Sequence, residues 1–295
     1  MLQLITWYGS RSGYYTIWHC AFKAPDYNPK MANHIRPEPS SHEWLYHLKL
    51  KVLGSGGSAL SAKRACPSFL LEDATLFDLG PGSLHNLRIS QVNPNKIRRL
   101  FISHPHADHI SDLIPFLWAI QIDGRQDELK VYGPPGFKGV FRKLLECTNT
   151  PPTFLTFPLT IEELNFGDRV DNISTCATVH SIPTLAFRVE SSNGRSFCYS
   201  ADTAYCSNIV TLAKNVDLLL HEATFVQDQT AIADLTKHST AHIAGQVARE
   251  ADAKHLVLFH VPPPNENREK EFTVQAETAF GDRCIISTDL AEFEI

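Results

Sequence analysis

Apolar and polar residues alternate along much of the chain after residue 47, and the pattern predicts short strands separated by helices. The first strand is predicted over 48–53, where the alternation ends in Gly-Ser-Gly-Gly. Further strands are predicted over 68–71, 74–77, 97–103, 129–132, 173–179, 185–189, 197–200, 216–220, 256–259 and 284–287. Apolar residues with helical spacing predict helices over 83–90, 110–120, 134–145, 208–213, 241–251 and 266–279. Strands that alternate with helices are typical of an α/β fold.

Residues 1–47 differ from the rest of the chain. They mix aromatic residues with Pro, Asn and His and show no sustained period. We interpret them as an N-terminal extension, which could be a small appendage, a partner-binding segment, or a stretch upstream of a later start at Met31. A single domain is predicted over 48–295.

The composition is that of a soluble globular protein, with 43% hydrophobic and 20% charged residues. A formal net charge of -5 argues against an unaided nucleic-acid binder, because such proteins usually carry a basic face. The seven cysteines are scattered and never form a C-x-x-C pair, which favours a reducing, cytoplasmic location over a disulfide framework. No apolar run reaches the roughly 18 residues of a membrane span.

Five of the predicted strands are followed by a histidine or an aspartate. These residues are His104, His180, Asp202, His221 and His260. A lone histidine is more often a surface or structural residue, but the same residue types recur here at the same structural position. Because strands of one sheet end at a shared edge, we expect these side chains to converge.

The run after the strand at 97–103 places three histidines and an aspartate within six residues: His104, His106, Asp108 and His109. Neutral imidazole and carboxylate suit zinc, with manganese or iron as alternatives. Four such ligands do not all fit one tetrahedral ion that also keeps an open catalytic position. The sequence therefore predicts a site for two divalent metal ions, with further ligands from His180, Asp202 and His260.

The run H-x-H-x-D-H resembles the motif of the metallo-β-lactamase fold. The segments DLGPG, SADT, HEAT, HSTA and VLFH extend the match from Leu48 to the C-terminus and resemble the ribonuclease Z-like branch. The resemblance implies an α/β fold of the αββα type, a four-layer sandwich with the metal ions at one edge of its two sheets.

The resemblance also implies a role for each matched residue. It divides the ligands between two ions, with one carboxylate bridging: His104, His106 and His180 on the first ion, Asp108, His109 and His260 on the second, and Asp202 between them. Glu222 and His238 would form a proton-donating pair, and Asp108 would hold the attacking water. His221 would be structural or would support a ligand, without binding a metal itself.

Other motifs have plainer interpretations. Gly54-x-Gly56-x-x-Ala59 loosely fits a dinucleotide fingerprint, but a strand follows at Pro67 where the fingerprint needs a helix, so a tight glycine turn is favoured. Asp78 either orients a metal-bound histidine or caps its loop, with equal weight. His85, His242 and His255 are interpreted as structural or exposed.

The predicted function is a metal-dependent phosphodiesterase. An alkoxide leaving group needs a proton, which a Glu222–His238 pair would supply, whereas a lactam ring opens without expelling a fragment. The alternatives are an arylsulfatase or lactonase, and a non-catalytic metal-binding scaffold.

Small esters are favoured over RNA as substrates. Ribonuclease Z proteins usually carry a long arm that grips transfer RNA, often between the third metal histidine and the bridging aspartate, yet only 21 residues separate His180 from Asp202. The chain also continues from His260 as Val-Pro-Pro-Pro, instead of the phosphate-contacting loop of the family. Transfer-RNA 3′ processing is the runner-up, and a homodimer is left open.

Overall fold

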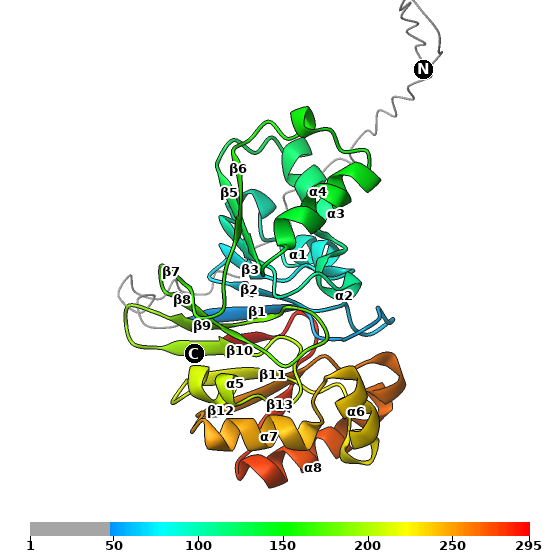
Figure 1. Ribbon diagram of the computed structural model, residues 1–295, viewed down its shortest axis with the longest axis vertical. Coiled ribbons are helices and arrows are strands. Elements are labelled where there is room, and N and C mark those ends of the chain that lie inside the picture. The colour runs from blue at the N-terminus through cyan, green and yellow to red at the C-terminus, as the bar shows by residue number, and fades with distance from the viewer. Residues whose placement is uncertain (1–47) are drawn as a thin grey trace, which may run out of the picture. The chain divides into compact units, whose positions relative to one another are not determined.

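The computed structural model describes residues 48–295, and the predicted extension over 1–47 lies outside this range. Two seven-stranded sheets pack face to face, and helices cover the outer face of each (Figure 1). The four layers confirm the αββα sandwich that the sequence predicts. In residues 48–295 we find no helix with the length and apolar character that crossing a bilayer requires.

The first sheet has the strand order β14-β1-β2-β3-β4-β5-β6. Its strands are β1 (Lys49–Gly54), β2 (Ser68–Leu71), β3 (Thr75–Phe77), β4 (Arg99–Phe101), β5 (Leu129–Gly133), β6 (Leu159–Glu163) and β14 (Glu292–Glu294). From β3 to β6 the neighbouring strands are parallel. Their carboxyl ends therefore meet at one edge of the sheet.

The second sheet has the order β13-β12-β11-β10-β9-β8-β7. Its strands are β7 (Arg169–Val170), β8 (Ile173–Ala177), β9 (Leu185–Glu190), β10 (Ser196–Tyr199), β11 (Leu218–Glu222), β12 (His255–Phe259) and β13 (Cys284–Ile286). The strands from β10 to β13 are parallel, so they too share a carboxyl edge.

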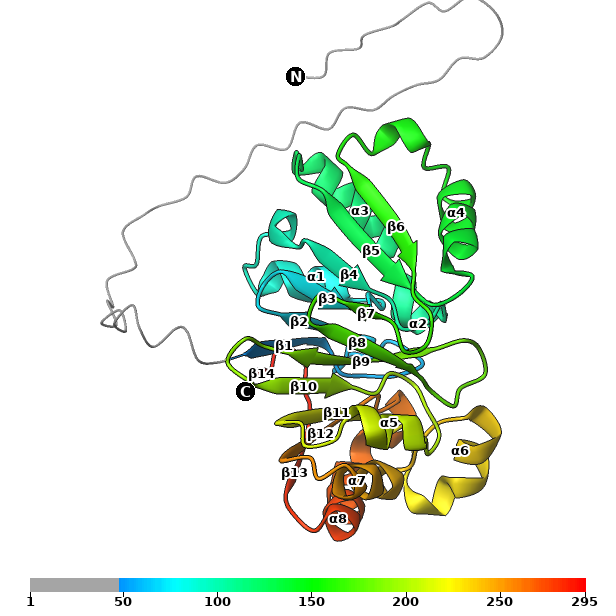
Figure 2. The same ribbon diagram turned by 60° about the vertical axis from the view of Figure 1, so that its left-hand side comes forward.

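The helices pack on the outer faces of the sheets. Those of the first half are α1 (Ser83–Ile89), α2 (Ala107–Ile110), α3 (Leu113–Ile122) and α4 (Phe137–Cys147), and those of the second half are α5 (Ser207–Leu212), α6 (Thr230–Thr236), α7 (Ala241–Glu250) and α8 (Glu269–Phe280). Short 3₁₀ turns are η2 (Pro94–Lys96), η3 (Pro152–Phe154), η4 (Gln227–Gln229) and η5 (Pro263–Arg268). Figure 2 shows α7 and α8 side by side outside β11–β13.

The period of two along each strand sends alternate side chains to different layers. In β2, Phe69 and Leu71 face the second sheet, whereas Leu70 faces the helices. The layer between the sheets is rich in aromatic rings, and Phe69 contacts both Tyr199 and Phe259 with centroids 5.0 and 5.1 Å apart. These large buried faces hold the two sheets, and hence their carboxyl edges, in a fixed relation.

Most predicted elements are present, and two of the differences have a clear local cause. The predicted helix over 110–120 is two helices, α2 and α3, which the chain divides at Ser111 and Asp112. Asp112 accepts a hydrogen bond from the backbone N–H of Leu84, so its carboxylate serves the neighbouring helix α1. Pro134 and Pro135 precede α4 instead of starting it, because Gly136 adopts φ 91 at its N-cap. The strands β6, β7 and β14 and the helix α6 were not predicted.

Candidate metal centre

The carboxyl edges of both sheets carry the polar residues singled out from the sequence. In the first sheet Asp78 follows β3 and His104 follows β4, with Ser103 just before it. In the second sheet Asp202 follows β10 and His260 follows β12. Parallel strands explain the convergence, because their carboxyl ends lie side by side.

The backbone at these strand ends is unusual. Asp78, Ala201 and His260 adopt left-handed conformations with φ of 57°, 51° and 70°. A non-glycine residue rarely adopts such a conformation, and these cluster at functional sites. Each one turns the chain sharply as it leaves its strand, which directs the polar side chains inward.

The first cluster consists of His104, His106, His180 and Asp202, whose ligand atoms lie within 4.8 Å of one another. Nδ1 of His106 lies 3.0 Å from Nε2 of His104 and 3.1 Å from Nε2 of His180. Burial is the main cause that lowers the pKa of all three imidazoles. They are therefore neutral at physiological pH, the form in which imidazole binds a metal ion.

The second cluster consists of Asp108, His109, Asp202 and His260, again within 4.8 Å of one another. Oδ2 of Asp202 lies 3.3 Å from Nε2 of His109, and its Oδ1 lies 3.4 Å from Nε2 of His260. Burial opposes the charge of Asp202, but His260 and His109 hold its pKa well below the usual range. One ionised carboxylate thus belongs to both clusters.

Two buried atoms of the second cluster lack hydrogen bonds within the described part of the chain, Nε2 of His109 and Oδ1 of Asp202. A buried polar atom without a partner is costly unless something satisfies it. Both atoms face the other members of the cluster, and imidazole nitrogen with carboxylate oxygen is a donor set for zinc, manganese or iron. The residues present therefore fit the divalent metal ions that this fold implies.

Asp78 lies beneath the clusters, fully buried, and accepts four hydrogen bonds. The donors are Nδ1 of His109 at 2.8 Å, the backbone N–H and hydroxyl of Ser103 at 2.7 Å each, and the hydroxyl of Tyr199 at 2.5 Å. Burial works against charge on His109, yet Asp202 and Asp78 raise its pKa well above the usual value. A metal ion on Nε2 would take the place of a proton there, while Nδ1–H still donates to Asp78. Of the two interpretations of Asp78, the contacts favour the orienting role.

Glu222 and His238 form a pair beside the clusters. Nδ1 of His238 lies 2.8 Å from Oε1 of the fully buried Glu222, which also accepts hydrogen bonds from the backbone N–H groups of Thr203 and Thr224. Burial opposes the protonation of His238, but Glu222 raises its pKa to about 9. The imidazole is thus protonated at neutral pH, and its ring lies 5.0 Å from that of His180.

The remaining candidates lie outside the clusters. His221 is inside β11 and not beyond its end, because the strand predicted over 216–220 was placed two residues too early. It is fully buried, and its Nδ1 donates to the carbonyl oxygen of Glu222 at 2.8 Å. His85 is exposed on α1, His242 lies on α7, and His255 is exposed at the start of β12.

The GSGG turn lies against His260. A Cβ added to Gly57 would be 2.3 Å from the His260 ring, so only a glycine fits there.

Several contacts of the site had no signal in the sequence. Tyr199 sits in an apolar strand, and its hydroxyl reaches Asp78 over 121 residues of sequence. Thr224 donates its hydroxyl to Glu222 at 2.9 Å and also lies 2.7 Å from Nδ1 of His260. Only its position in the HEAT run could have indicated it.

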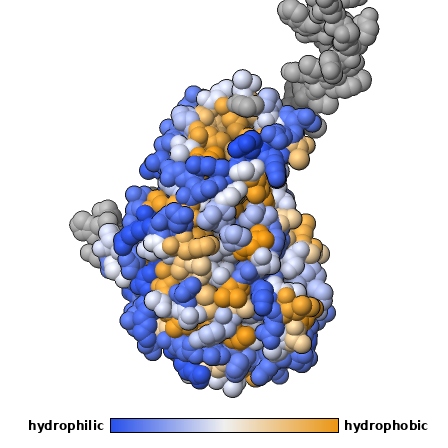
Figure 3. Space-filling view, viewed as in Figure 1, coloured by the Kyte–Doolittle hydropathy of each residue, from blue (hydrophilic) through white to orange (hydrophobic). Residues whose placement is uncertain are grey.

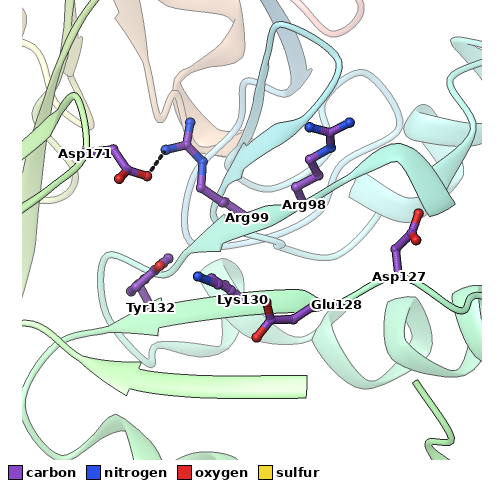
Figure 4. Close-up of a pocket in the computed structure, with 7 residues that line it drawn as sticks. All are labelled: Arg98, Arg99, Asp127, Glu128, Lys130, Tyr132 and Asp171. Carbon is purple, nitrogen blue, oxygen red and sulfur yellow. Dashed lines mark hydrogen bonds and ion pairs between the residues drawn. The ribbon is translucent and has the colours of Figure 1, made fainter. Parts of the chain in front are cut away.

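A separate hollow of about 410 Å³ lies at the opposite edge of the first sheet, where β4 and β5 begin (Figure 4). Arg99 points toward Asp171, and the two form an ion pair of 3.3 Å. The lining contains three cations and three carboxylates: Arg98, Arg99, Lys130, Asp127, Glu128 and Asp171, together with Tyr132. These balanced charges at the amino ends of the strands are typical of a solvated surface.

Comparison with known proteins gives concordant matches. A family model for the β-lactamase superfamily domain matches residues 74–261. The ribonuclease Z of Bacillus velezensis is 28% identical over 273 aligned positions, covering 72% of this chain and 88% of that protein. Since 72% of 295 residues is about 212, roughly 60 of these positions are residues that the Bacillus protein has and this chain lacks.

Two solved structures are similar over nearly their whole length. The metallo-β-lactamase fold protein YhfI from Bacillus subtilis has a TM-score of 0.72 and 26% identity, covering 84% of this chain and 100% of YhfI. The short form of human tRNase Z has a TM-score of 0.70 and 25% identity, covering 83% of this chain and 98% of its own. The matches confirm the resemblance to the ribonuclease Z-like branch.

Asp78→Asn tests whether this carboxylate orients His109. An asparagine keeps the size of the side chain but removes the charge that faces Nδ1 of His109. We expect metal affinity to fall by about 10–100-fold, the usual effect of losing such a partner. Competition with a metal-binding dye measures the affinity, and thermal unfolding reports folding. Unchanged affinity in a folded variant would mean that Asp78 only caps its loop.

Proposed function

Because this chain belongs to the β-lactamase superfamily and is a metal-dependent hydrolase, we propose that it holds two divalent ions, zinc first among them, and hydrolyses phosphodiesters. The observation that carries the proposal is the carboxylate of Asp202. It belongs to both ligand clusters: its Oδ2 lies 3.6 Å from Nε2 of His104 in the first cluster, and its Oδ1 lies 3.4 Å from Nε2 of His260 in the second. A carboxylate shared in this way suits a pair of ions.

The clusters divide the ligands as follows: His104, His106 and His180 for one ion, Asp108, His109 and His260 for the other, and Asp202 for both. When bound, two such ions activate water near neutral pH and offset charge on a phosphoryl group. Asp108 would accept a hydrogen bond from the attacking water. Burial opposes its ionisation, but the hydrogen bond with His260 lowers its pKa, so a carboxylate faces the site.

His238 donates the proton that the leaving alkoxide requires. Glu222 holds Nδ1 of the imidazole, fixes the orientation of the ring and favours its protonated form. Without such a proton, an alkoxide leaving group departs slowly from a phosphodiester. This pair is the reason to favour phosphodiesters over lactams, and the scaffold alternative offers no use for it.

Small diesters are the proposed substrates. The chain lacks roughly 60 residues of its Bacillus relative, and between His180 and Asp202 it builds only β9, β10 and their turn. Folded RNA binds through many phosphate contacts from lysine and arginine, and the chain has 27 of these against 32 acidic residues. Transfer-RNA 3′ processing is therefore the second candidate, supported by the match to human tRNase Z.

The surface next to the site also suits an apolar substrate group. Figure 3 shows apolar surface over α6, whose exposed residues include Ile232 and Leu235. The residue after α6, Lys237, accepts a hydrogen bond at its carbonyl oxygen from Nδ1 of His180. The helix thus borders the first cluster.

The bridging role of Asp202 is testable by metal content. The wild-type protein should hold close to two ions per chain, and Asp202→Ala should lose metal and activity together. Elemental analysis after gel filtration measures the first quantity, and turnover of bis(p-nitrophenyl) phosphate the second. Full metal content with full turnover in the variant would refute the shared carboxylate.

The proton donor is testable by the choice of leaving group. Glu222→Ala and His238→Ala should each slow the hydrolysis of alkyl diesters by about 10²–10⁴, the usual range for general acid catalysis. The same variants should affect p-nitrophenyl esters much less, because that leaving group needs little protonation. His85→Ala, an exposed histidine on α1, is the matched control. Equal losses on both kinds of ester would indicate a structural role.

Substrate size is testable by comparing kcat/KM on precursor transfer RNA and on small diesters at physiological salt. We expect weak, salt-sensitive cleavage of the RNA, since counterion release makes such binding fall with salt. Turnover of the small diesters should be better. Efficient cleavage next to the discriminator base would overturn the preference and establish the transfer-RNA enzyme.

A further inference from the structure

The turn over residues 54–58 touches the second cluster at three points. The backbone N–H of His260 donates to the carbonyl oxygen of Ser55 at 2.9 Å, and Gly57 lies directly against the His260 ring. The backbone N–H of Ser58 donates to Oδ2 of Asp108 at 2.9 Å. Asp108 belongs to the first half of the chain and His260 to the second. The turn is thus the template that sets these two side chains relative to each other.

The position of this turn depends on Asp289, which lies between β13 and β14. Its Oδ1 accepts from the backbone N–H of Ser55 at 3.0 Å and from the Ser55 hydroxyl at 2.7 Å. Its Oδ2 accepts from the backbone N–H of Ala65 at 2.7 Å and from Nδ2 of Asn86 at 3.0 Å. One carboxylate therefore ties both ends of the segment that contains the turn, and it ties them to α1.

Arg64 completes the network from the other side. The residue is buried, and its guanidinium donates to the Ser55 hydroxyl at 2.7 Å and to the carbonyl oxygen of Ser287. It also forms an ion pair with Glu269 at 2.7 Å, at the start of α8. Ser55 is thereby held by a carboxylate and a guanidinium at once. Charged partners make stronger hydrogen bonds than neutral ones, so the turn is firmly placed.

We propose that Asp289 is a positioning residue for the second metal site, acting through Ser55 and the 54–58 turn. Asp289 itself forms no hydrogen bond with Asp108 or His260. The turn contacts these two residues, and the contacts described above include no histidine of the first cluster. The inference rests on the proposed metal role of Asp108 and His260. It assigns to Asp289 a selective effect on one of the two ions.

Asp289→Asn is the informative substitution because it keeps the shape of the side chain. All four partners of Asp289 are donors, so the amide NH₂ of an asparagine must face at least one N–H or O–H. The turn then loses at least one hydrogen bond on one side. We expect metal affinity at the second site, that of Asp108, His109 and His260, to fall by about 10–100-fold, with the first site unchanged.

Asp217→Asn is the matched control. Asp217 is a buried carboxylate that, like Asp289, accepts a hydrogen bond from a backbone N–H, that of Ser196 at 2.8 Å, and it pairs with Lys254 at 2.8 Å. It precedes β11, at the edge of the sheet opposite to the clusters. Its loss should lower the melting temperature and leave both ions in place.

The experiment is zinc content per folded chain after equilibration with increasing chelator, with thermal unfolding of every variant. Wild type and Asp217→Asn should pass together from two ions to none, and Asp289→Asn should show a plateau at one. If Asp289→Asn lost both ions at the same chelator concentrations as the wild type, or lost them in proportion to unfolding, the positioning role would be overturned. A wild-type protein that binds a single ion would overturn this inference and the two-metal proposal alike.

Discussion

The carboxylate of Asp202 is the constraint on which the arrangement of the site depends. It is buried and ionised between imidazoles that come from both sheets, with His109 on one side and His260 on the other. An isolated buried charge costs several kcal/mol, so it persists only when partners surround it. Both sheets must therefore end at the same place, and the aromatic layer between them fixes that relation.

The fold meets this constraint with parallel strands and strained strand ends. Asp78, Ala201 and His260 leave their strands in left-handed backbone conformations. Such conformations cost of order 1–3 kcal/mol each and need a rigid surrounding structure. The hydrogen bonds around Asp78 and around the 54–58 turn supply this rigidity next to the ligands. The packed layers beneath the site therefore hold the ligand side chains in their positions.

The sequence predicts a strand well where both of its faces are apolar. Strand β2 was predicted residue by residue, because apolar side chains on both of its faces meet a core. Helix α6 was missed because only Ala233 of its seven residues is buried, so it has no apolar stripe to recognise. The break between α2 and α3 was missed because the helical spacing of apolar residues continues across Ser111 and Asp112, although the helix itself is interrupted there.

The site, too, was predicted only in part. The types of the ligand residues and their places at strand ends could be predicted, since residue chemistry and strand direction are local properties of the chain. The supporting contacts were not, because they are made across long separations. The hydroxyl of Tyr199 reaches Asp78 across 121 residues, and Asp289 reaches Ser55 across 234. Nothing near Tyr199 or Asp289 in the sequence indicates these partners.

Anomalous X-ray diffraction from crystals of the zinc-loaded protein would show whether Asp202 joins two ions, because it locates each ion without reference to activity. Two zinc peaks are expected about 3.5–4 Å apart, the usual spacing of paired ions. The carboxylate of Asp202 should lie within bonding distance of both. A single peak, or two peaks that do not share Asp202, would contradict it.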